Sequence, residues 1–352
     1  AAIPPITASS TERMIYMQAL VRNQALQIEL QAISEPQLSA ADEVKIKIEY
    51  CSLCRDDMHT GDALAIFGGS GIIGHEAAGV VVEAGARAQQ DGFLPGVRVA
   101  IIPMEFCGSC PSCLAGQPQY CPEAHISSGV IAEYIIRKPS QLIKIPHKLS
   151  YQQAVLMETV GDVMAAISKL KLDFDSDVLL VGGGYTGQLF LRLLRLRGIH
   201  RIAVIEPIEV RRQLALEHGA DAAYGPAHPS LQVKLLEQTN FRGFPVVIDT
   251  SADAEMLEFV QPCVTRGGTM LLFAYCDTQS KLTFPSLNMY MNNISVIWSC
   301  MCSPRTMEQA GDIIQRLRLE ELITAEYPIK KSKQAYENYL TTAQIKIGIR
   351  VG

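Results

Sequence analysis

One loop of the chain holds four cysteines whose spacing could bind a metal ion. In CGSCPSCLAGQPQYC, residues 107–121, the intervals between successive cysteines are two, two and seven residues. Such a set could hold structural zinc or an iron–sulfur cluster, form disulfides, or provide a redox-active C-x-x-C pair. A redox pair normally opens a helix, whereas this loop lies among β-type segments. Four-thiolate sets most often hold structural zinc, which favours Cys107, Cys110, Cys113 and Cys121 as its ligands.

A second motif, VGGGYTGQ, has the glycine spacing of a dinucleotide-binding turn. Gly182, Gly184 and Gly187 form G-x-G-x-x-G after an apolar segment and at the start of a helical one, which is the context that the motif requires. The first glycine allows a tight turn, and the second lets the backbone approach a pyrophosphate. The third lets the helix pack on the strand. Free N–H groups at the helix start would bind the anion.

The end of the next apolar segment indicates which cofactor binds. The letters IEP place Glu206 where a carboxylate can accept a hydrogen bond from a ribose 2′-OH. The same carboxylate would repel a 2′-phosphate, so NAD is the predicted cofactor. Arg211, predicted to contact the cofactor, and Arg212 follow closely and keep NADP as the alternative. Without a cofactor, the pattern would be an ordinary turn and helix with a solvated glutamate.

Three residues scattered along the chain could form a catalytic metal site. Cys54 lies in CSLCRDDMHT, His75 precedes EAAGVVVEAG, and Glu158 lies in METVGDV. Each alone would usually be structural, but beside a nicotinamide cofactor they indicate a soft-ligand site. A catalytic zinc needs about three protein ligands and one open position. One thiolate and one carboxylate would neutralise Zn²⁺ and leave it a Lewis acid.

Composition limits the classes of protein to which the chain could belong. Its 352 residues suffice for two domains, and 48% are hydrophobic, as in an ordinary globular protein. A formal net charge of −5 argues against nucleic-acid binding. No apolar run reaches the roughly 18 to 20 residues that cross a bilayer, so no membrane contact is expected. The opening residues lack the features of a signal peptide, which favours a cytoplasmic location, where disulfides are rare.

The pattern of apolar residues divides the chain into parts that must position these groups. From Met17 to Ala154, short β-type runs alternate with glycine and proline, which predicts a loop-rich β region. From about residue 177 to 300, strands alternate with helices, which predicts a parallel sheet covered on both faces. The five expected strands are VLLVGGG, RIAVIEP, FPVVIDT, TMLLFAY and ISVIWSC. A helix is expected over 305–319, followed by short strands that rejoin the first region.

The motifs and their order resemble those of the zinc-dependent medium-chain alcohol and polyol dehydrogenases, in the branch of sorbitol and threonine dehydrogenases. The resemblance rests on CSLCRDDMHT, GHEAAGVVVEAG, the four-cysteine loop, METVGDV, VGGGYTG and EHGAD, and it extends from about Met17 onward. It implies an α/β fold in which a GroES-like β-rich catalytic domain joins a doubly wound Rossmann domain with a parallel sheet. The catalytic domain would span 17–158 and 301–352, the Rossmann domain 159–300, and residues 1–16 would be a flexible extension.

The resemblance also implies roles for individual residues. Two zinc ions would bind per chain, one catalytic, at Cys54, His75 and Glu158, and one structural, at the four-cysteine loop. Glu76 would be a carboxylate that can approach the catalytic metal, and Asp57 would orient the zinc histidine. His59 would be the outer histidine of a proton path, and Arg350 would reach a cofactor phosphate.

The implied reaction is reversible hydride transfer between an alcohol carbon and the nicotinamide, with a small alcohol or carbonyl compound as substrate. Two residues differ from the pattern of the family: Asp56 replaces a serine or threonine, and Asp162 replaces a hydrophobic or hydroxyl residue. They would either recognise a polyhydroxy or amino-bearing substrate or belong to a hydrogen-bond network.

Several alternatives stay open. A secondary alcohol is expected as substrate, with a polyol, sugar or cyclitol favoured. The alternatives are an NADPH-linked carbonyl reductase on the same fold and a non-catalytic cofactor-binding protein. Relatives form dimers or tetramers, so a homodimer or homotetramer is expected, with ISVIWSC as a candidate contact.

Overall fold

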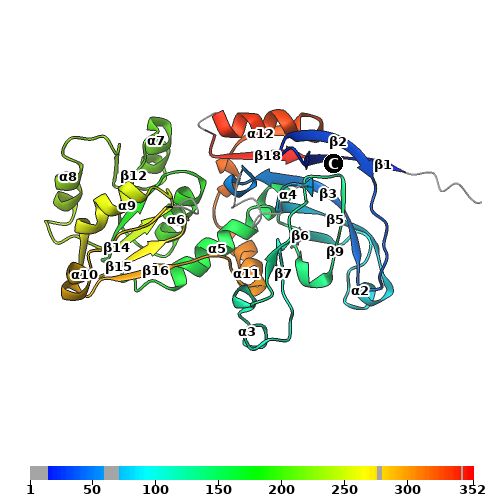
Figure 1. Ribbon diagram of the computed structural model, residues 1–352, viewed down its shortest axis with the longest axis horizontal. Helices are drawn as coiled ribbons and strands as arrows, with labels where there is room; N and C mark the ends of the chain where they lie inside the picture. Colours follow the sequence, from blue (N-terminus) through cyan, green and yellow to red (C-terminus); the bar gives the residue numbers. More distant parts are fainter. Residues whose placement is uncertain (1–14, 59–70, 276–279, 342–343) are drawn as a thin grey trace, which may run out of the picture.

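The computed structural model describes residues 15–58, 71–275, 280–341 and 344–352. Two parts lie side by side along the long axis of the molecule, one rich in β-strands and the other built on a helix-covered sheet (Figure 1). Two helices, α5 (Met157–Ser168) and α11 (Pro304–Ile314), lie between them. Within the described ranges, no helix is both long and apolar enough to span a bilayer.

Two sheets form most of the β-rich part. The smaller has the order β2-β1-β4, and the larger has the order β10-β6-β5-β3-β18-β17, with β9 also paired to β3. Their strands are β1 (Tyr16–Arg22), β2 (Ile28–Ser34), β3 (Val44–Leu53), β4 (Gly71–Ile72), β5 (Glu76–Ala84), β6 (Arg98–Ile101), β9 (Tyr134–Arg137), β10 (Leu142–Lys144), β17 (Ile323–Pro328) and β18 (Lys346–Arg350). Because β18 pairs with β3, the end of the chain rejoins the first region, as predicted.

The central strand β3 brings the candidate metal ligands together. Its alternating apolar residues, such as Ile46 and Ile48, are fully buried, which fixes its register in the sheet. Strand β3 ends directly before Cys54, and β5 begins directly after His75. The antiparallel register places Ser52 opposite Glu76, so both candidate ligands lie at the same edge of the sheet.

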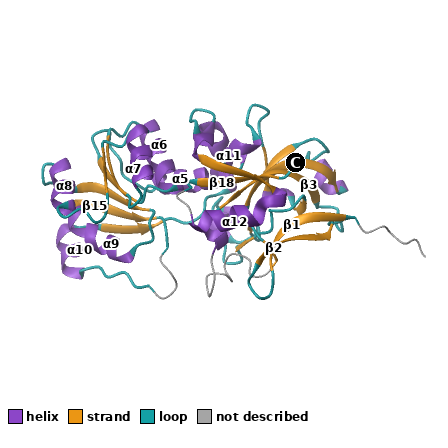
Figure 2. Ribbon diagram, turned by 90° about the horizontal axis from the view of Figure 1, so that it is seen from above, coloured by secondary structure: helices purple, strands orange, loops and turns teal. Residues whose placement is uncertain are grey.

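The second part contains a six-stranded parallel sheet in the order β13-β12-β11-β14-β15-β16, which is the doubly wound Rossmann order. The strands are β11 (Asp177–Val181), β12 (Arg201–Ile205), β13 (Ala222–Tyr224), β14 (Phe244–Asp249), β15 (Val264–Leu272) and β16 (Ser295–Trp298). Five of them are the strands predicted from the sequence; β13 is the addition. Helices α6 (Tyr185–Leu196) and α7 (Glu209–Glu217) lie on one face, and α9 (Ala254–Val260) and α10 (Ser286–Asn292) on the other (Figure 2).

Helices α5 and α11 pack closely because α5 carries a glycine where they meet. A Cβ at Gly161 would lie 2.8 Å from Cys302 Sγ and 3.0 Å from Met307 Cα. Helix α5 runs through the predicted domain boundary between residues 158 and 159, so one rigid element connects the two parts. Helix α11 ends at Ile314, five residues before the predicted end at Leu319, where a short 3-10 turn begins.

Two glycines of the VGGGYTGQ turn differ in what a side chain would meet. A Cβ at Gly187 would lie 2.1 Å from the Gly182 carbonyl oxygen, whereas a Cβ at Gly184 would meet only Arg211 Nη1, at 3.7 Å. We expect Gly187→Ala to destabilise the fold by about 1–3 kcal/mol, as overpacking of a core does. Gly184→Ala should keep the melting temperature but weaken dinucleotide binding, because its methyl group would face the pyrophosphate.

Thermal unfolding and a fluorescence titration with NADH measure the two effects separately. Equal melting temperatures for Gly187→Ala and the wild type would contradict the steric account.

Candidate active site

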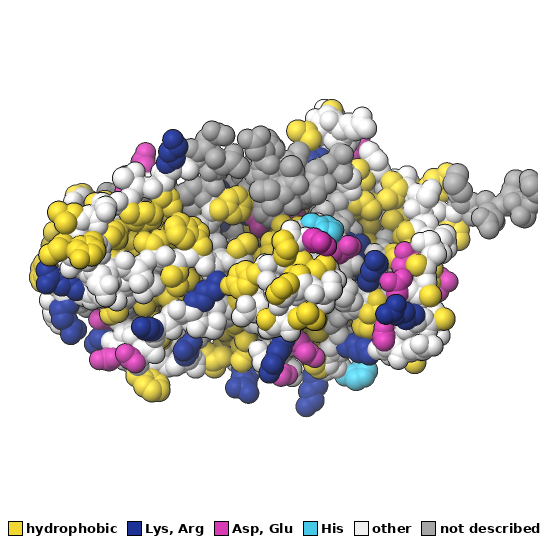
Figure 3. Space-filling view, turned by 60° about the horizontal axis from the view of Figure 1, so that its bottom comes forward, with side chains coloured by type: hydrophobic (Ala, Val, Ile, Leu, Met, Phe, Trp, Pro, Cys, Tyr) yellow, Lys and Arg dark blue, Asp and Glu magenta, His cyan; other side chains and the backbone are white. Residues whose placement is uncertain are grey.

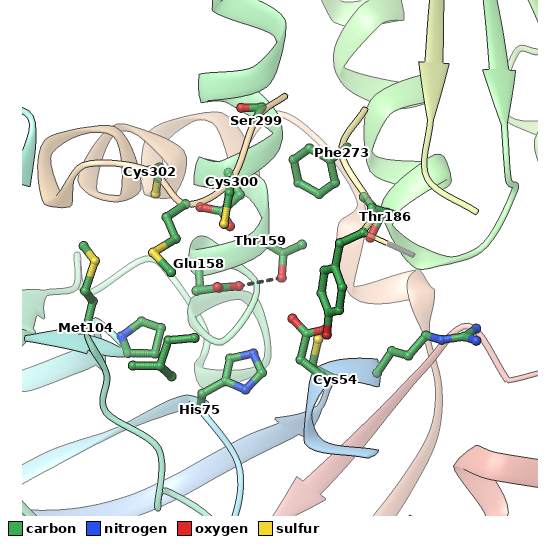
Figure 4. A pocket seen from close by; sticks show the side chains of 18 of the residues that line it. Cys54, His75, Met104, Glu158, Thr159, Thr186, Phe273, Ser299, Cys300 and Cys302 are labelled. Atoms are coloured by element: carbon green, nitrogen blue, oxygen red, sulfur yellow. Dashed lines mark hydrogen bonds between the residues drawn. The ribbon is translucent and has the colours of Figure 1, made fainter. Parts of the chain in front are cut away.

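A cavity of about 490 Å³ lies between the two parts. The candidate metal ligands Cys54, His75 and Glu158 line it on one side. Residues just beyond the carboxyl ends of the Rossmann strands, such as Phe273, line the other side together with Thr186 of the glycine turn. Figure 4 shows His75 and Cys54 facing Glu158 of α5, with Thr186 and Phe273 opposite. The predicted ligands and the predicted cofactor turn therefore meet at one cavity.

One carboxylate positions two of the ligands. Asp57 Oδ1 lies 2.9 Å from His75 Nδ1, and Asp57 Oδ2 accepts a hydrogen bond from the Cys54 backbone N–H, also at 2.9 Å. Asp57 is only 5% exposed, so water weakens neither contact. With Nδ1 engaged, Nε2 is the histidine nitrogen left for a metal, which is the arrangement found around many metal-binding histidines.

The ligand atoms form two overlapping groups. Cys54, Asp56 and His75 make one group, and His75, Glu76 and Glu158 make the other; within each group all ligand atoms lie within 4.8 Å of one another. His75 belongs to both. Asp56 belongs to the group with Cys54, whereas Glu76 and Glu158 belong to the other, and neither group contains both Cys54 and Glu158. The other partners of these carboxylates therefore help to decide which of them binds a metal beside His75.

The hydrogen bonds separate Glu76 from Glu158. Glu76 accepts from Ser52 Oγ, from Thr159 Oγ1 at 2.9 Å, and from Lys346 Nζ, which lies 2.6 and 2.5 Å from its two oxygens. Within the described part of the chain, the one hydrogen bond of the Glu158 side chain is with the same Thr159 hydroxyl, whose Oγ1 lies 2.8 Å from a Glu158 oxygen and shares its single proton between the two carboxylates (Figure 4). Glu76 is therefore already neutralised, and Glu158 keeps lone pairs for a cation.

Burial raises the pKa of the candidate thiol and carboxyl ligands, so these groups hold protons that a bound metal would displace. Burial, followed by the nearby Asp56 carboxylate, raises the pKa of the Cys54 thiol to about 12. Burial also raises the pKa of Glu158. For His75, burial alone would lower the pKa, but the Asp57 carboxylate raises it well above its usual value. Because thiolate, imidazole and carboxylate bind metals in their deprotonated forms, zinc binding should release protons here. The soft and neutralising donor set fits Zn²⁺.

The four cysteines of the predicted structural site converge as well. Their sulfur atoms all lie within 4.8 Å of one another, and every cysteine described in this loop is a free thiol. Cys107 Sγ lies 4.0 Å from Cys113 Sγ and 3.6 Å from Cys121 Sγ. Backbone N–H groups of Ser109 and Cys110 lower the pKa of Cys107 to about 6, which favours the thiolate. The arrangement fits a closed four-thiolate zinc site.

Glu206 braces the glycine turn. Its side chain is buried and accepts hydrogen bonds from the backbone N–H groups of Gly183 at 2.7 Å and of Ile208 at 2.9 Å. Gly182 has a φ of +100°, a conformation that favours glycine. Arg211 donates to the Gln344 carbonyl oxygen at 2.9 Å. The helix packs on the strand at Gly187 with no room for a Cβ, and the backbone beside Gly184 is open, which fits a bound dinucleotide.

Both unusual acids line the cavity. The Tyr275 hydroxyl donates to Asp56 Oδ1 at 3.5 Å, and Asp162 pairs with the Cys302 thiol. Burial, and then the Glu158 carboxylate, raise the pKa of Asp162 well above its usual value.

The structure places one of the two other predicted residues. His59 falls outside the described residues. The Arg350 side chain is 58% exposed and pairs with Glu326 at 4.0 Å. Sequence reasoning missed Lys346, a buried lysine four residues earlier on β18. The one feature of the sequence that could have indicated a buried lysine is a charged residue between Ile345 and Ile347 in a short strand.

Comparisons with known proteins identify the class. "Alcohol dehydrogenase GroES-like domain" matches residues 40–147, and "Zinc-binding dehydrogenase" matches residues 186–316. D-arabinitol dehydrogenase 1 from Uromyces fabae is 27% identical over 323 residues, which cover 88% of this chain and 90% of that protein. L-threonine 3-dehydrogenase from Pyrococcus furiosus is 28% identical over 310 residues, which cover 84% and 87%. A zinc-binding dehydrogenase from Sinorhizobium meliloti bound to NADP has a TM-score of 0.86 at 23% identity, covering 96% of this chain and 100% of that one.

The chain belongs to the zinc-dependent medium-chain alcohol and polyol dehydrogenases. It is an oxidoreductase that uses zinc and transfers a hydride between an alcohol and NAD(P). The predicted fold class, a GroES-like domain joined to a Rossmann domain, is confirmed.

Replacing one cysteine of the loop should remove one zinc ion. We expect Cys113→Ser to lose about one zinc per chain and to melt at a lower temperature, because a four-thiolate site contributes directly to folding. Cys263→Ser, at a buried cysteine of the Rossmann core, is the matched control and should retain its zinc. Elemental analysis and thermal melting measure both quantities. A Cys113→Ser protein with undiminished zinc content would refute the structural zinc site.

Proposed function

We propose that this enzyme oxidises the secondary hydroxyl group of a polyol, sugar or cyclitol, with NAD as the preferred cofactor. The observation that carries the proposal is the single cavity lined by both Cys54, His75 and Glu158 and the carboxyl ends of the Rossmann strands. A substrate oxygen near these ligands and a nicotinamide entering over the glycine turn would meet there. Ligand sites in doubly wound folds lie at this edge of the sheet.

In this proposal Cys54, His75 and Glu158 hold the catalytic zinc, which supplies a Lewis acid for the alcohol or carbonyl oxygen. Asp57 holds the His75 ring and the Cys54 backbone in place. The cofactor accepts the hydride, and the protein sets distance and orientation.

Proton removal falls to Asp56 in this proposal. Asp56 lies in the group of ligand atoms around His75 and accepts a hydrogen bond from Tyr275 across the cavity. It stands where relatives carry a hydroxyl residue and can take a proton from the substrate hydroxyl group. His59 stays the predicted outer station of this path.

The acids of the cavity support a polyhydroxy substrate. Asp56 and Asp162 add carboxyl groups to walls that are otherwise largely apolar, such as Met104 and Phe273. Protonated Asp162 could both donate to and accept from a hydroxyl group. Arg55 is the only lysine or arginine among the described residues that line the cavity, so an anionic substrate is disfavoured. D-arabinitol, named in a relative, is a neutral polyol.

Glu206 supports NAD over NADP. Its carboxylate is held by two backbone N–H groups and keeps further lone pairs for ribose hydroxyl groups. A 2′-phosphate would meet this buried negative charge. The side chain of Arg212 already donates hydrogen bonds to the backbone carbonyl oxygens of Glu206 and Pro207 and to the Glu209 carboxylate. Arg211 is the remaining cation nearby and keeps NADP as the weaker alternative.

The turnover of wild-type and Asp57→Asn proteins tests the proposal. We expect the wild type to oxidise at least one neutral polyol with NAD. The absorbance of the NADH formed measures this activity across a panel of alcohols, polyols and amino sugars. Asp57→Asn should lower kcat/KM about 10- to 100-fold, as loss of a carboxylate behind a zinc histidine does. Asp91→Asn, at an exposed acid, is the control. The proposal fails if the zinc-loaded wild type turns over no compound of the panel with either cofactor.

We also propose that the enzyme forms a homodimer or homotetramer through the edge of its parallel sheet. Among the described strands, β16 is the last of that sheet and pairs with β15 alone, and Trp298 is 57% exposed. Leu287, Tyr290 and Met291 of the neighbouring α10 are more exposed still. Figure 3 shows hydrophobic side chains gathered at this end of the molecule. An exposed apolar edge strand is a ready surface for pairing with a second copy.

Light scattering during size-exclusion chromatography measures the oligomeric state. We expect a dimer or tetramer for the wild type and a monomer for Trp298→Arg, because an arginine on the edge places two charges against each other in a two-fold contact. Phe174→Arg, at another exposed apolar residue, should leave the mass unchanged. A monomeric wild type, or an unchanged mass for Trp298→Arg, would contradict this interface.

A further inference from the structure

A second cavity, of about 370 Å³, lies next to the active-site cavity. Its walls come from the loop of the four cysteines, from helix α5 and from the start of α11. The loop contributes Gln117, Gln119 and Tyr120, and α11 contributes Thr306 and Gln309. Among the described residues that line this cavity, none is a candidate metal ligand or part of the glycine turn. The cavity therefore needs an explanation of its own.

The two cavities share part of their walls, because Met301 and Ser303 line both. Ser303 is held in place, since its hydroxyl oxygen accepts a hydrogen bond from the Thr306 backbone N–H at 3.2 Å and caps α11. Met301 has a φ of +58°, a conformation that is costly for residues other than glycine. Its unbranched side chain can adopt several shapes. A ligand too long for the active-site cavity could therefore extend past Met301 into the second cavity.

Three glutamine side chains line the second cavity without a hydrogen-bond partner in the described part of the chain. They are Gln117, Gln119 and Gln309. The Oε1 atom of Gln119 is buried as well, and a buried acceptor without a donor is costly. Each amide can both donate and accept hydrogen bonds. Three such amides at one cavity favour a ligand that itself carries several donors and acceptors.

The other polar groups of the lining narrow the chemistry of this ligand. Tyr120, Ser168 and Thr306 supply hydroxyl groups, and none of the described lining residues is acidic, which disfavours a cation. Lys169 is the one cation of the described lining, and its ammonium group already donates to the Trp298 carbonyl oxygen at 3.1 Å, which disfavours an anion. Amides and hydroxyl groups both donate and accept, as sugar hydroxyl groups do. The lining therefore matches a neutral carbohydrate.

Tyr120 adds an apolar surface to these polar groups. Its side chain belongs to the loop of the four cysteines and is 53% exposed. A tyrosine ring combines an apolar face with a polar hydroxyl group. A sugar ring has the same combination, because its C–H groups form an apolar face and its hydroxyl groups lie around the edge. The ring of Tyr120 thus suits the same ligand as the amides.

We propose that the second cavity binds a further sugar unit of the substrate, so that the substrate is a neutral carbohydrate of disaccharide size. The reacting hydroxyl group would lie near Cys54, His75 and Glu158, and the further unit would lie beyond Met301. The proposal rests on the proposed oxidation of a polyol or sugar, and it adds a second binding site and the size of the substrate. The active-site cavity, of about 490 Å³, must hold the nicotinamide ring as well, so a larger substrate needs the additional space.

Binding of sugar alcohols of two sizes tests the proposal without turnover. The probes are sorbitol and two disaccharide alcohols, maltitol and lactitol, which carry a glucosyl or a galactosyl unit on sorbitol. Isothermal titration calorimetry on the zinc-loaded protein saturated with NADH measures each affinity. We expect at least one disaccharide alcohol to bind at least about tenfold more tightly than sorbitol, because its second unit adds hydrogen bonds.

Two variants locate this additional affinity. Ser168→Trp narrows the second cavity, and Gln309→Leu removes one of its amides; both residues are exposed, so both variants should fold. Each variant should lose the tighter binding of the disaccharide alcohol and keep the wild-type affinity for sorbitol. Gln315→Leu, the same change at the exposed end of α11 and outside the lining, is the matched control and should alter neither affinity.

Equal affinities of the wild type for sorbitol and both disaccharide alcohols would overturn the proposal, because a cavity that holds only water adds no affinity. An unchanged difference in either Ser168→Trp or Gln309→Leu would overturn it as well. Tighter binding of sorbitol 6-phosphate than of maltitol and lactitol would contradict the neutral class of ligand. The proposed function fails separately: a protein that binds these alcohols but oxidises none of them with NAD or NADP would contradict the reaction and leave the second binding site supported.

Discussion

The antiparallel pairing of β3 with β5 is the constraint on which the rest of the site depends. It places Cys54 and His75, which lie 21 residues apart in the sequence, at one edge of a buried sheet. The buried apolar face of β3 fixes the register, and a shift by one residue would turn every side chain to the opposite face. Strand β18 pairs with β3 at the same edge and adds Lys346. The β-rich sheet thus supplies two candidate ligands and the buried Lys346, and helix α5 supplies Glu158.

The hydrogen bonds of three neighbouring carboxylates give each of them a different role. Asp57 is committed to His75 and the Cys54 backbone, and Glu76 is committed to Lys346. Glu158 alone among these three has no cation or histidine as a hydrogen-bond partner in the described structure. A buried site with several acids would otherwise be ambiguous, because each could bind a divalent ion. Position along the chain does not resolve this, whereas the donors around each carboxylate do.

Much of this arrangement could be predicted from the sequence, and the rest depends on long-range contacts. Apolar runs marked five strands of the parallel sheet, but β13 is only Ala-Ala-Tyr, too short for any periodicity. Cys54, His75 and Glu158 could be singled out because their residue types and order carry the resemblance to a family. Lys346 could not, because its burial depends on Glu76, which lies 270 residues away in the sequence. Strand alternation alone places Lys346 on the same face as the exposed Arg350.

The central claim is that the metal and the nicotinamide meet in one cavity. Proton relaxation of NAD bound to the cobalt-substituted protein tests it most directly, because a paramagnetic ion broadens the signals of nearby protons. The account predicts strong relaxation enhancement of the nicotinamide protons, little for the adenine protons, and its loss in Cys54→Ser. Equal enhancement of both rings, or enhancement that survives in Cys54→Ser, would contradict it.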